Sequence, residues 1–344
     1  MTDMSYTSLG NSGLVVSRMA FGTMTFTHGS DWIPGVAKVD LQHAQQMVDL
    51  ALDRGVNFFD TADDYSGGAA EDILGKTLKG KRNGAVVCTK LGFRQSGRMN
   101  DAGLSRSHIT ASVEGSLQRL GTDWIDLLVL HKTDFTTPME ETLRTLQTLI
   151  DAGKVHHIGV SNWPAWQLAR AIQFQRDNGM QQFVAGQYLY NAVGRDIEVD
   201  VLKLGQDMGV GLMSWSPLAG GLLTGKYDPA DLEKGEGRLT KGNFLQVSPA
   251  QATAALDALN AAAEAHKSSP AQIAQAWILN KRRDHTVIIG ASKISQLDSA
   301  IDAANISLSE AEMAAIDAAA APARRYPEWF DDMMTDEQFT KALS

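Results

Sequence analysis

Four side chains that can donate, accept or stabilise a proton stand at the ends of apolar runs or just beyond them. Asp60 ends the run VNFFD with Tyr65 five residues later across a polar turn, Lys90 ends AVVCTK, and His131 ends DLLVLH. A phenol with a pKa of about 10 is a poor acid at neutral pH, and a nearby ammonium lowers that pKa. We therefore expect Lys90 to lower the pKa of Tyr65, and Asp60 to hold Lys90 charged and in place. His131 would orient a carbonyl oxygen or help to relay a proton.

This combination of groups suits a site that protonates the oxygen of a carbonyl while another group attacks its carbon. No side chain in the set is an obvious nucleophile, so a hydride supplied by a cofactor is the natural candidate. Each residue also has an ordinary structural explanation when it is taken alone. Asp60 could cap a helix, Tyr65 could be a loop aromatic, and His131 could be a core histidine. Their occurrence together at successive run ends favours the catalytic interpretation.

Eight apolar or β-branched runs alternate with eight amphipathic helical patterns along most of the chain. We predict strands in the runs 19–23, 56–60, 85–90, 126–131, 155–161, 182–187, 210–216 and 286–292. The helical patterns cover 40–54, 71–79, 107–120, 138–152, 163–177, 197–208, 270–281 and 294–304. Runs that are apolar on successive residues are typical of strands buried on both faces, in a parallel sheet with right-handed crossovers. Eight such units predict a closed (β/α)8 TIM barrel, in one domain over residues 1–344.

A doubly wound open sheet is the structural alternative to the barrel. That fold leads us to expect a GxGxxG motif directly after the first strand, and the sequence has none there. The closed barrel is therefore favoured.

Several segments fall outside the eight units. Residues 5–17 read as a β-hairpin that could plug the bottom of the barrel. Two extra helices are predicted over 248–266 and 310–319, the second opened by a capping box. We expect the stretch ARRYPEWFDDMM to be irregular and the tail 320–344 to lie over the substrate pocket.

Composition limits the classes of partner and compartment. The 344 residues carry a net charge of −9, which disfavours a broad nucleic-acid or anionic-membrane surface. Cys88 is the only cysteine, so no internal disulfide can form, which suits a reducing cytosol. The start MTDMSYTSLG shows no signal-peptide pattern, and no apolar run approaches the roughly 20 residues that span a bilayer. We expect a cytoplasmic protein.

The sequence resembles the aldo-keto reductase superfamily from about residue 5 to about residue 330. Each matching motif is weak alone, but their order and spacing are jointly specific. The matching stretches are SGLVVSRMAFGTM, FFDTADDY, CTKLG, DLLVLH, GKVHHIGVSN, WSPLAGGLLTGKY and IIGASKISQLD. The resemblance implies that Tyr65 is the general acid and that Lys90 and Asp60 tune it. It implies a carbonyl-orienting role for His131, ordered binding with the cofactor first, and no metal.

The resemblance also implies a nicotinamide cofactor held by the later strand ends. Ser161, Asn162 and Gln187 match positions that bind the carboxamide, and Trp215 matches the aromatic that stacks on the nicotinamide ring. The loop that wraps the pyrophosphate would contain Ser216, Pro217, Leu218, Gly220 and Lys226. The adenosine ribose and its 2′-phosphate would lie near Ser292, Lys293 and Gln296. Strand-end residues Gly22, Thr23 and Gly290 complete the predicted cofactor site.

The choice between NADPH and NADH depends on few cations. Position 292 is Ser where many relatives carry Arg, and position 300 is Ala where the family often has Asn against the adenine. Lys293, at the predicted start of the last barrel helix, is then the clear cation for a 2′-phosphate. We expect NADPH, with NADH still open.

The expected reaction is the reversible reduction of an aldehyde or ketone. Trp32 in the first long loop and Trp329 in the tail are predicted to wall a substrate pocket for apolar or bulky carbonyls. Two other functions are alternatives to this reaction. Some relatives bind the cofactor as regulatory or redox-sensing subunits of a membrane channel, and the four catalytic positions do not separate these readings. A metal-dependent barrel hydrolase needs clustered ligands at strand ends, where only Asp60 and His131 are found. The physiological substrate and the oligomeric state stay open.

Overall fold

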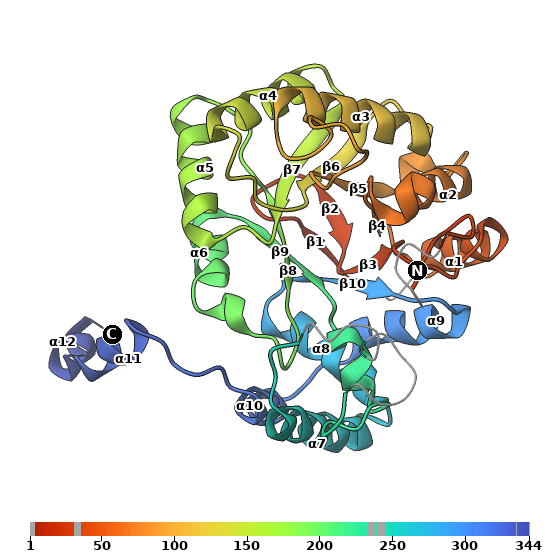
Figure 1. The fold of residues 1–344 in the computed structure, drawn as a ribbon. Coiled ribbons are helices and arrows are strands. Elements are labelled where there is room, and N and C mark those ends of the chain that lie inside the picture. The colour runs from red at the N-terminus through yellow and green to blue at the C-terminus, as the bar shows by residue number, and fades with distance from the viewer. Residues whose placement is uncertain (1–3, 31–35, 233–238, 240–244, 335, 344) are drawn as a thin grey trace.

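The computed structural model describes residues 4–30, 36–232, 239, 245–334 and 336–343. Eight parallel strands form a closed barrel in which each strand pairs with its neighbours in chain order, and the last pairs with the first (Figure 1). The strands are β3 (Met19–Gly22), β4 (Phe58–Asp60), β5 (Val86–Leu91), β6 (Ile125–Leu130), β7 (Val155–Ser161), β8 (Ala185–Leu189), β9 (Gly211–Trp215) and β10 (Thr286–Gly290). The predicted (β/α)8 barrel is confirmed.

A helix follows each strand of the barrel and covers its outer surface (Figure 1). These helices are α1 (Leu41–Asp53), α2 (Ala69–Thr77), α3 (Arg106–Leu120), α4 (Met139–Asp151), α5 (Ala165–Asp177), α6 (Val201–Met208), α8 (Pro270–Lys281) and α9 (Ile294–Asp302). Local sequence fixes several starts, since the side chains of Asp40 and Ser105 accept backbone N–H bonds at the first turns of α1 and α3. Ser269 and Gln272 form a capping box before Pro270.

The inside of the barrel is built in layers because successive side chains of a strand point to opposite faces. One inward layer is an apolar cluster of Ala20, Phe58, Cys88, Leu127, Val129, Ala185, Met213 and Ile288. The inward positions two residues further along the strands form the layer at the carboxyl end of the barrel. They are Gly22, Asp60, Lys90, His131, Gln187, Trp215 and Gly290, with Ser161 in register beside Gln187. The fold therefore gathers the predicted polar residues in one layer.

The predicted hairpin consists of β1 (Tyr6–Ser8) paired antiparallel with β2 (Val15–Ser17). Leu9 and Val16 are fully buried in the same apolar cluster that fills the barrel interior. Gly10 lies so close to the barrel wall that a Cβ there would come within 2.2 Å of the Val184 carbonyl oxygen. The hairpin thus closes the barrel at the end opposite the polar layer.

Two extra helices, α7 (Pro249–His266) and α10 (Glu310–Ala319), form as the sequence predicts. The prediction that ARRYPEWFDDMM is irregular is wrong, because α11 (Glu328–Met333) forms within it, and α12 (Glu337–Leu343) follows. Pro327 directly precedes α11, a position where proline is favourable, and α12 is rich in good helix formers. Both helices lie outside the ring of barrel helices in Figure 1, and Glu328 of α11 pairs with Lys203 of α6. Short 3-10 helices are η1 (Tyr65–Gly68), η2 (Arg82–Gly84), η3 (Asp196–Glu198), η4 (Ala219–Thr224) and η6 (Ala303–Asn305).

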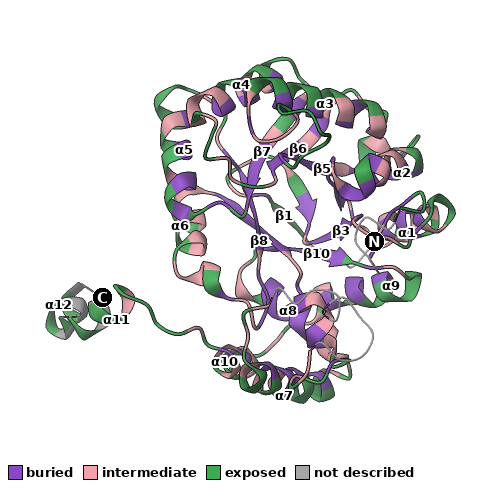
Figure 2. Ribbon diagram, in the orientation of Figure 1, coloured by how far each residue is buried: buried purple, intermediate pink, exposed green. Residues whose placement is uncertain are grey.

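Burial follows this architecture. Buried residues lie along the strands and on the helix faces turned toward them, and exposed residues lie on the outer helix faces (Figure 2). Within the described part of the chain, no helix combines the length and the apolar character needed to cross a membrane. One charged side chain is nevertheless among the largest that are fully buried, and it is Lys90.

Candidate active site

Lys90 lies at the centre of a hydrogen-bonded group at the carboxyl end of the barrel. Its Nζ atom donates to Oδ2 of Asp60 at 2.7 Å, to the Thr61 carbonyl oxygen at 2.7 Å and to the Tyr65 hydroxyl at 3.1 Å. An ammonium has three donors, so these bonds use all of them. The structure thus brings together three of the four residues singled out from the sequence.

Burial controls the acidity of Tyr65 in this structure. Burial of the phenol, with a contribution from the charge of Asp60, raises the pKa of Tyr65 to about 12, although the Lys90 ammonium opposes the shift. Lys90 acts to lower the pKa of Tyr65, as expected, but loss of hydration outweighs the nearby positive charge and leaves the pKa above that of a free phenol. Burial also disfavours the Lys90 ammonium, but the charges of Asp60 and Tyr65 outweigh it and raise the pKa of Lys90. At neutral pH the phenol holds its proton and the lysine is charged.

The chain places Tyr65 by a tight left-handed turn after β4. Ser66 and Gly67 have φ values of 51° and 64°, and Gly68 follows at 91°. A Cβ at Gly68 would lie 2.7 Å from Cδ of Arg119, so only glycine fits there without displacement. A non-glycine residue with positive φ is uncommon, and such strain gathers at functional sites. The turn carries the phenol back over the end of β5.

His131 lies beside this group but contacts it differently. Its ring packs edge-on against Tyr65 with ring centroids 5.9 Å apart, and against Phe93 at 4.7 Å. Its Nδ1 atom is 3.4 Å from Oδ1 of Asp64. Burial lowers the pKa of His131, and Asp64 acts in the opposite direction. Sequence reasoning missed Phe93 and Asp64, although Asp64 directly precedes Tyr65 in DTADDY.

A second group of buried polar residues lies next to the turn that follows β4. Glu71 is fully buried and accepts hydrogen bonds from Thr89 Oγ1 and from Arg119 Nε, the latter at 2.7 Å. Asp63 is also buried, and neither of its carboxyl oxygens has a hydrogen-bond partner among the described residues. Burial first, and then the charges of Glu71 and Asp64, raise the pKa of Asp63 to about 8. The turn therefore rests on an acid that is protonated at neutral pH.

The residues expected to bind the nicotinamide ring and its carboxamide are linked by side-chain hydrogen bonds, three of them to one another and Gln187 to Asp60. Trp215 Nε1 donates to Oδ1 of Asn162 at 3.1 Å, and Asn162 Nδ2 donates to Ser161 Oγ at 2.8 Å. Gln187 Nε2 donates to Oδ1 of Asp60 at 2.8 Å. Asn162 has a φ of 59°, another strained position at the end of a strand. Four predicted residues thus line one side of the layer that holds the tetrad of Asp60, Tyr65, Lys90 and His131.

The predicted pyrophosphate loop has a backbone suited to an anion. Positive φ values occur at Ser216, Ala219, Gly220 and Gly221, from 48° to 98°, and successive amides in such turns form anion-binding nests. A Cβ at Gly221 would lie 2.8 Å from Nζ of Lys226, so the lysine ammonium lies against this loop. Pro217 is buried and Leu218 is half-buried. These residues fit the phosphates of a dinucleotide.

The predicted adenosine end is open and exposed. Gly290 pairs in register with Gly22, and a Cβ at Gly290 would meet nothing within 4 Å. Lys293 and Gln296 are exposed at the start of α9, where no side chain caps the helix. Ser292 is half-buried beside them. The Ser292 N–H donates to Oε1 of Gln296 at 3.1 Å. A lysine at a helix N-terminus suits a phosphate. Thr23, in contrast, is buried and bonded through N and Oγ1 to the Asp60 carbonyl oxygen, at 2.8 and 3.1 Å.

The structure places only one of the two tryptophans that were predicted to wall the substrate pocket. Trp32 lies outside the described residues. Trp329 on α11 is 46% exposed and packs with Tyr326 and Phe330, while Glu328 of the same helix pairs with Lys203 of α6 at 2.7 Å. The aromatic ring that does contact His131 is Phe93.

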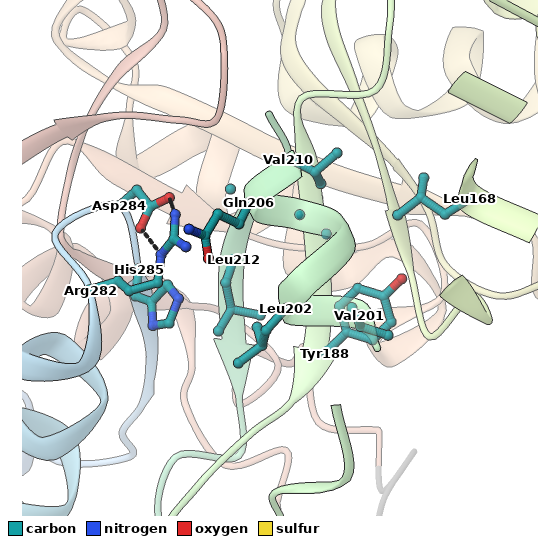
Figure 3. A pocket seen from close by; sticks show the side chains of 13 residues that line it. Leu168, Tyr188, Val201, Leu202, Gln206, Val210, Leu212, Arg282, Asp284 and His285 are labelled. Atoms are coloured by element: carbon teal, nitrogen blue, oxygen red, sulfur yellow. Dashed lines mark hydrogen bonds and ion pairs between the residues drawn. The ribbon is translucent and has the colours of Figure 1, made fainter. Parts of the chain in front are cut away.

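A small cavity lies away from these residues, between α6 and the outer side of strands β8 and β9 (Figure 3). Its volume is about 20 Å³, enough for one water molecule. The paired side chains of Arg282 and Asp284 are among its lining residues, with buried His285 next to them. It contains none of the predicted site residues. Within the described ranges, no three metal-ligating side chains are grouped as a metal ion requires.

Comparison with known proteins places the chain in a family. The sequence matches the Aldo/keto reductase family over residues 18–321. It is 34% identical over 302 residues to a protein named "Probable voltage-gated potassium channel subunit beta" from Oryza sativa subsp. japonica, covering 86% of this chain and 89% of that protein. A protein of the same name from Arabidopsis thaliana is 33% identical over 311 residues, covering 88% and 92%. A "Putative voltage-gated potassium channel subunit beta" from Schizosaccharomyces pombe is 36% identical over 299 residues, covering 84% and 85%. The chain therefore belongs to the aldo/keto reductase family, a family of NAD(P)H-dependent oxidoreductases.

Proposed function

We propose that this protein is an NADPH-dependent reductase of aldehydes or ketones, acting reversibly, with Tyr65 as the proton donor. The observation that carries the proposal is the buried hydrogen bond of 3.1 Å from Lys90 Nζ to the Tyr65 hydroxyl. When bound, the cofactor would supply the hydride that adds to the carbonyl carbon. A buried phenol beside a charged lysine is the group that this chain can use to protonate the oxygen.

The proton step uses groups that are already in place. The O–H bond of Tyr65 breaks as the O–H bond of the product alcohol forms, and the resulting phenolate faces the Lys90 ammonium. Asp60 and the Thr61 carbonyl hold that ammonium at 2.7 Å each, so it need not reorganise during the reaction. Because burial raises the pKa of Tyr65 to about 12, the phenol is protonated at neutral pH. In this state Tyr65 can donate a proton to the carbonyl oxygen.

The remaining layer supports a nicotinamide dinucleotide as the cofactor. The indole of Trp215 ends β9 in the inward layer, hydrogen-bonded to Asn162 at 3.1 Å. The loop from Ser216 to Gly221 offers backbone amides, and Lys293 adds a positive charge where the 2′-phosphate of NADPH would lie. We assign the adenosine end to Ser292, Lys293 and Gln296 on this basis. A small carbonyl substrate would approach beside His131 and Phe93, whose rings are 4.7 Å apart.

Titration with NADPH and, separately, NADH tests this proposal. Binding is followed by quenching of tryptophan fluorescence, and a Trp215→Phe variant identifies the part of the signal that comes from the inward layer. Tight quenching by NADPH with weaker quenching by NADH supports the cofactor assignment. A panel of aldehydes and ketones is then added, and loss of NADPH absorbance measures turnover. Failure of both cofactors to bind would remove the hydride donor and the proposal with it.

A cofactor-binding subunit of a channel is the second candidate. The observation that favours it is that the three relatives reported above, from two plants and a yeast, all bear the name of a potassium channel β subunit. A sensing subunit would bind NADPH tightly but oxidise it slowly, whereas an enzyme would complete many turnovers. Single-turnover oxidation of bound NADPH by the best carbonyl, compared with the steady-state rate, separates the two.

A further inference from the structure

Two buried polar atoms face one another beside the tetrad. Nδ1 of His131 and Oδ1 of Asp64 are both shielded from solvent, and neither has a hydrogen-bond partner of standard geometry among the described residues. They lie 3.4 Å apart, and their side chains are only 13% and 15% exposed. A buried polar atom without a partner is costly, so each of these atoms has the other as its available partner.

Both residues are held by their surroundings. The His131 ring packs edge-on against Tyr65 and Phe93, while its backbone N–H donates to the Leu91 carbonyl at 2.8 Å. Asp64 lies in the turn before η1, where its own carbonyl oxygen accepts from the Gly67 N–H at 3.0 Å. Rotation of either side chain alone would leave the other atom unpartnered. The facing arrangement is therefore part of the turn that also places Tyr65.

We propose that Asp64 is a positioning residue for His131: its carboxylate accepts the Nδ1 proton of the imidazole and leaves Nε2 as the nitrogen for the substrate oxygen. The nature of that substrate rests on the proposed function, whereas the contact between the two side chains does not. In a neutral imidazole one nitrogen carries the proton and the other accepts. Fixing the proton on Nδ1 thus makes Nε2 an acceptor in the neutral ring.

Under this assignment, the neutral and the protonated forms of His131 would bind different substrates. The neutral ring accepts a hydrogen bond at Nε2 and suits the O–H group of an alcohol. The imidazolium donates from both nitrogens and suits the oxygen of a carbonyl. Asp64 faces Nδ1 in both states, and its negative charge stabilises the imidazolium. The carboxylate therefore extends carbonyl binding toward higher pH.

The charged groups around the ring decide the direction of the effect. Burial and the charge of Lys90 on β5 lower the pKa of His131, whereas Asp64 and Asp60 of β4 raise it. The ring of Phe93 packs on His131 without charge of its own, and Tyr65 is protonated. Without the Asp64 charge, only Asp60 opposes the lowering of the His131 pKa by burial and by Lys90. The pKa of His131 then falls further.

Nuclear magnetic resonance of the full chain with ring-labelled histidine tests the inference without any substrate. A His131→Gln variant assigns the signal among the eight histidines. We expect the neutral form to carry its proton on Nδ1 in the wild type. Asp64→Asn should lower the titration midpoint of His131 by about 1 pH unit or more, since an opposite charge at this distance has an effect of that size. Asp64→Ala should also move the neutral-state proton to Nε2.

Asp63→Asn is the matched control, because Asp63 is the neighbouring acid and is protonated at neutral pH. It should leave both the tautomer and the midpoint of His131 unchanged below pH 8. An Asp64→Asn protein with the wild-type midpoint, or an Asp64→Ala protein with the wild-type tautomer, overturns the inference. In steady-state kinetics, the pH above which carbonyl reduction is lost should be lower for Asp64→Asn than for the wild type. Alcohol oxidation at high pH should be retained. Absence of carbonyl reduction in every variant and in the wild type would sink the proposed function and leave the resonance result standing.

Discussion

Gln187 donates from Nε2 to Oδ1 of Asp60 at 2.8 Å, on the opposite side of the carboxylate from the oxygen that binds Lys90. Both side chains are buried, so this is a charge-assisted bond in a dry environment. The residue expected to hold a carboxamide is thus joined to the residue that fixes the lysine. We infer that the cofactor end and the proton-transfer end of the site are built as one rigid unit.

Gln187→Ala should therefore weaken turnover as well as cofactor binding. Loss of a hydrogen bond to a charged group costs about 1.5–3 kcal/mol, which corresponds to roughly a 10-fold or larger fall in kcat. Steady-state kinetics at saturating NADPH measures the effect on turnover alone. Gln181→Ala, which changes an exposed glutamine, is the control. If Gln187→Ala changes only the dissociation constant of NADPH, Gln187 does not support Asp60.

Tyr65→Phe should keep the cofactor site and lose the proton donor. General acid catalysis contributes about 10²-fold to 10⁴-fold, and kcat should fall by that factor. Fluorescence titration should give the wild-type dissociation constant for NADPH, because the ring itself stays in place against His131. Tyr6→Phe removes an exposed tyrosine hydroxyl, bonded to the Gly55 carbonyl at 2.7 Å, and serves as the control. Reduction by Tyr65→Phe at the wild-type rate would exclude the mechanism.

Asp63 should make the protein less stable as the pH rises. The pKa of this carboxyl is about 8 in the folded chain and near 3.8 when exposed, so the folded state binds one more proton between those values. The free energy of unfolding therefore falls with pH across that window, by at most about 1.4 kcal/mol per unit. The contribution is fully present below pH 4 and lost as pH passes 8.

Asp63→Asn removes this titration and keeps a neutral side chain of the same shape. The melting temperature of Asp63→Asn minus that of the wild type should therefore increase with pH, and it should be larger at pH 9 than at pH 5.5. Asp123→Asn, at an exposed position, should show the same difference from wild type at both pH values. A melting-temperature difference for Asp63→Asn that does not depend on pH contradicts the assignment.

Much of this site could be predicted because a parallel barrel carries its strand ends to one place. Asp60, Lys90 and Gln187 stand two residues beyond the buried Phe58, Cys88 and Ala185, so periodicity alone sets their side chains in one inward layer. The strand and helix runs could also be predicted, because most residues of the barrel strands are buried and several helices begin at Asp or Ser caps.

What the sequence did not show depends on turn geometry and desolvation. The contact between Asp64 and His131 depends on the path of the turn after β4, which includes a left-handed backbone at Ser66 and which no pattern of residue types specifies. The raised pKa of Tyr65 reflects how completely the phenol is buried, and spacing carries no information about that. The helices of the tail were missed because their apolar residues have no face to bury against the barrel, and Phe339 is 65% exposed.

Gly10→Ala should destabilise the hairpin that closes the barrel. Its φ is 55°, and an added Cβ would lie 2.2 Å from the Val184 carbonyl oxygen and 2.6 Å from that of Gly209. Overpacking of this kind costs about 1–3 kcal/mol, and urea unfolding measures it. Gly13→Ala in the same hairpin meets nothing within 4 Å and should be nearly neutral. Equal stability of the two variants would show that the hairpin does not bear on the barrel.

Lys293 should decide how strongly the protein prefers NADPH to NADH. It is exposed at the uncapped start of α9, where the helix dipole also favours an anion, and Ser292 beside it carries no charge. NADH lacks the 2′-phosphate, so Lys293→Ala should weaken NADPH binding by about 10-fold and leave NADH binding unchanged. Fluorescence titration of both cofactors measures this difference, with Lys79→Ala as an exposed-lysine control. Equal weakening of NADPH and NADH would place Lys293 on a phosphate that both cofactors share. No weakening of either would move the 2′-phosphate away from α9.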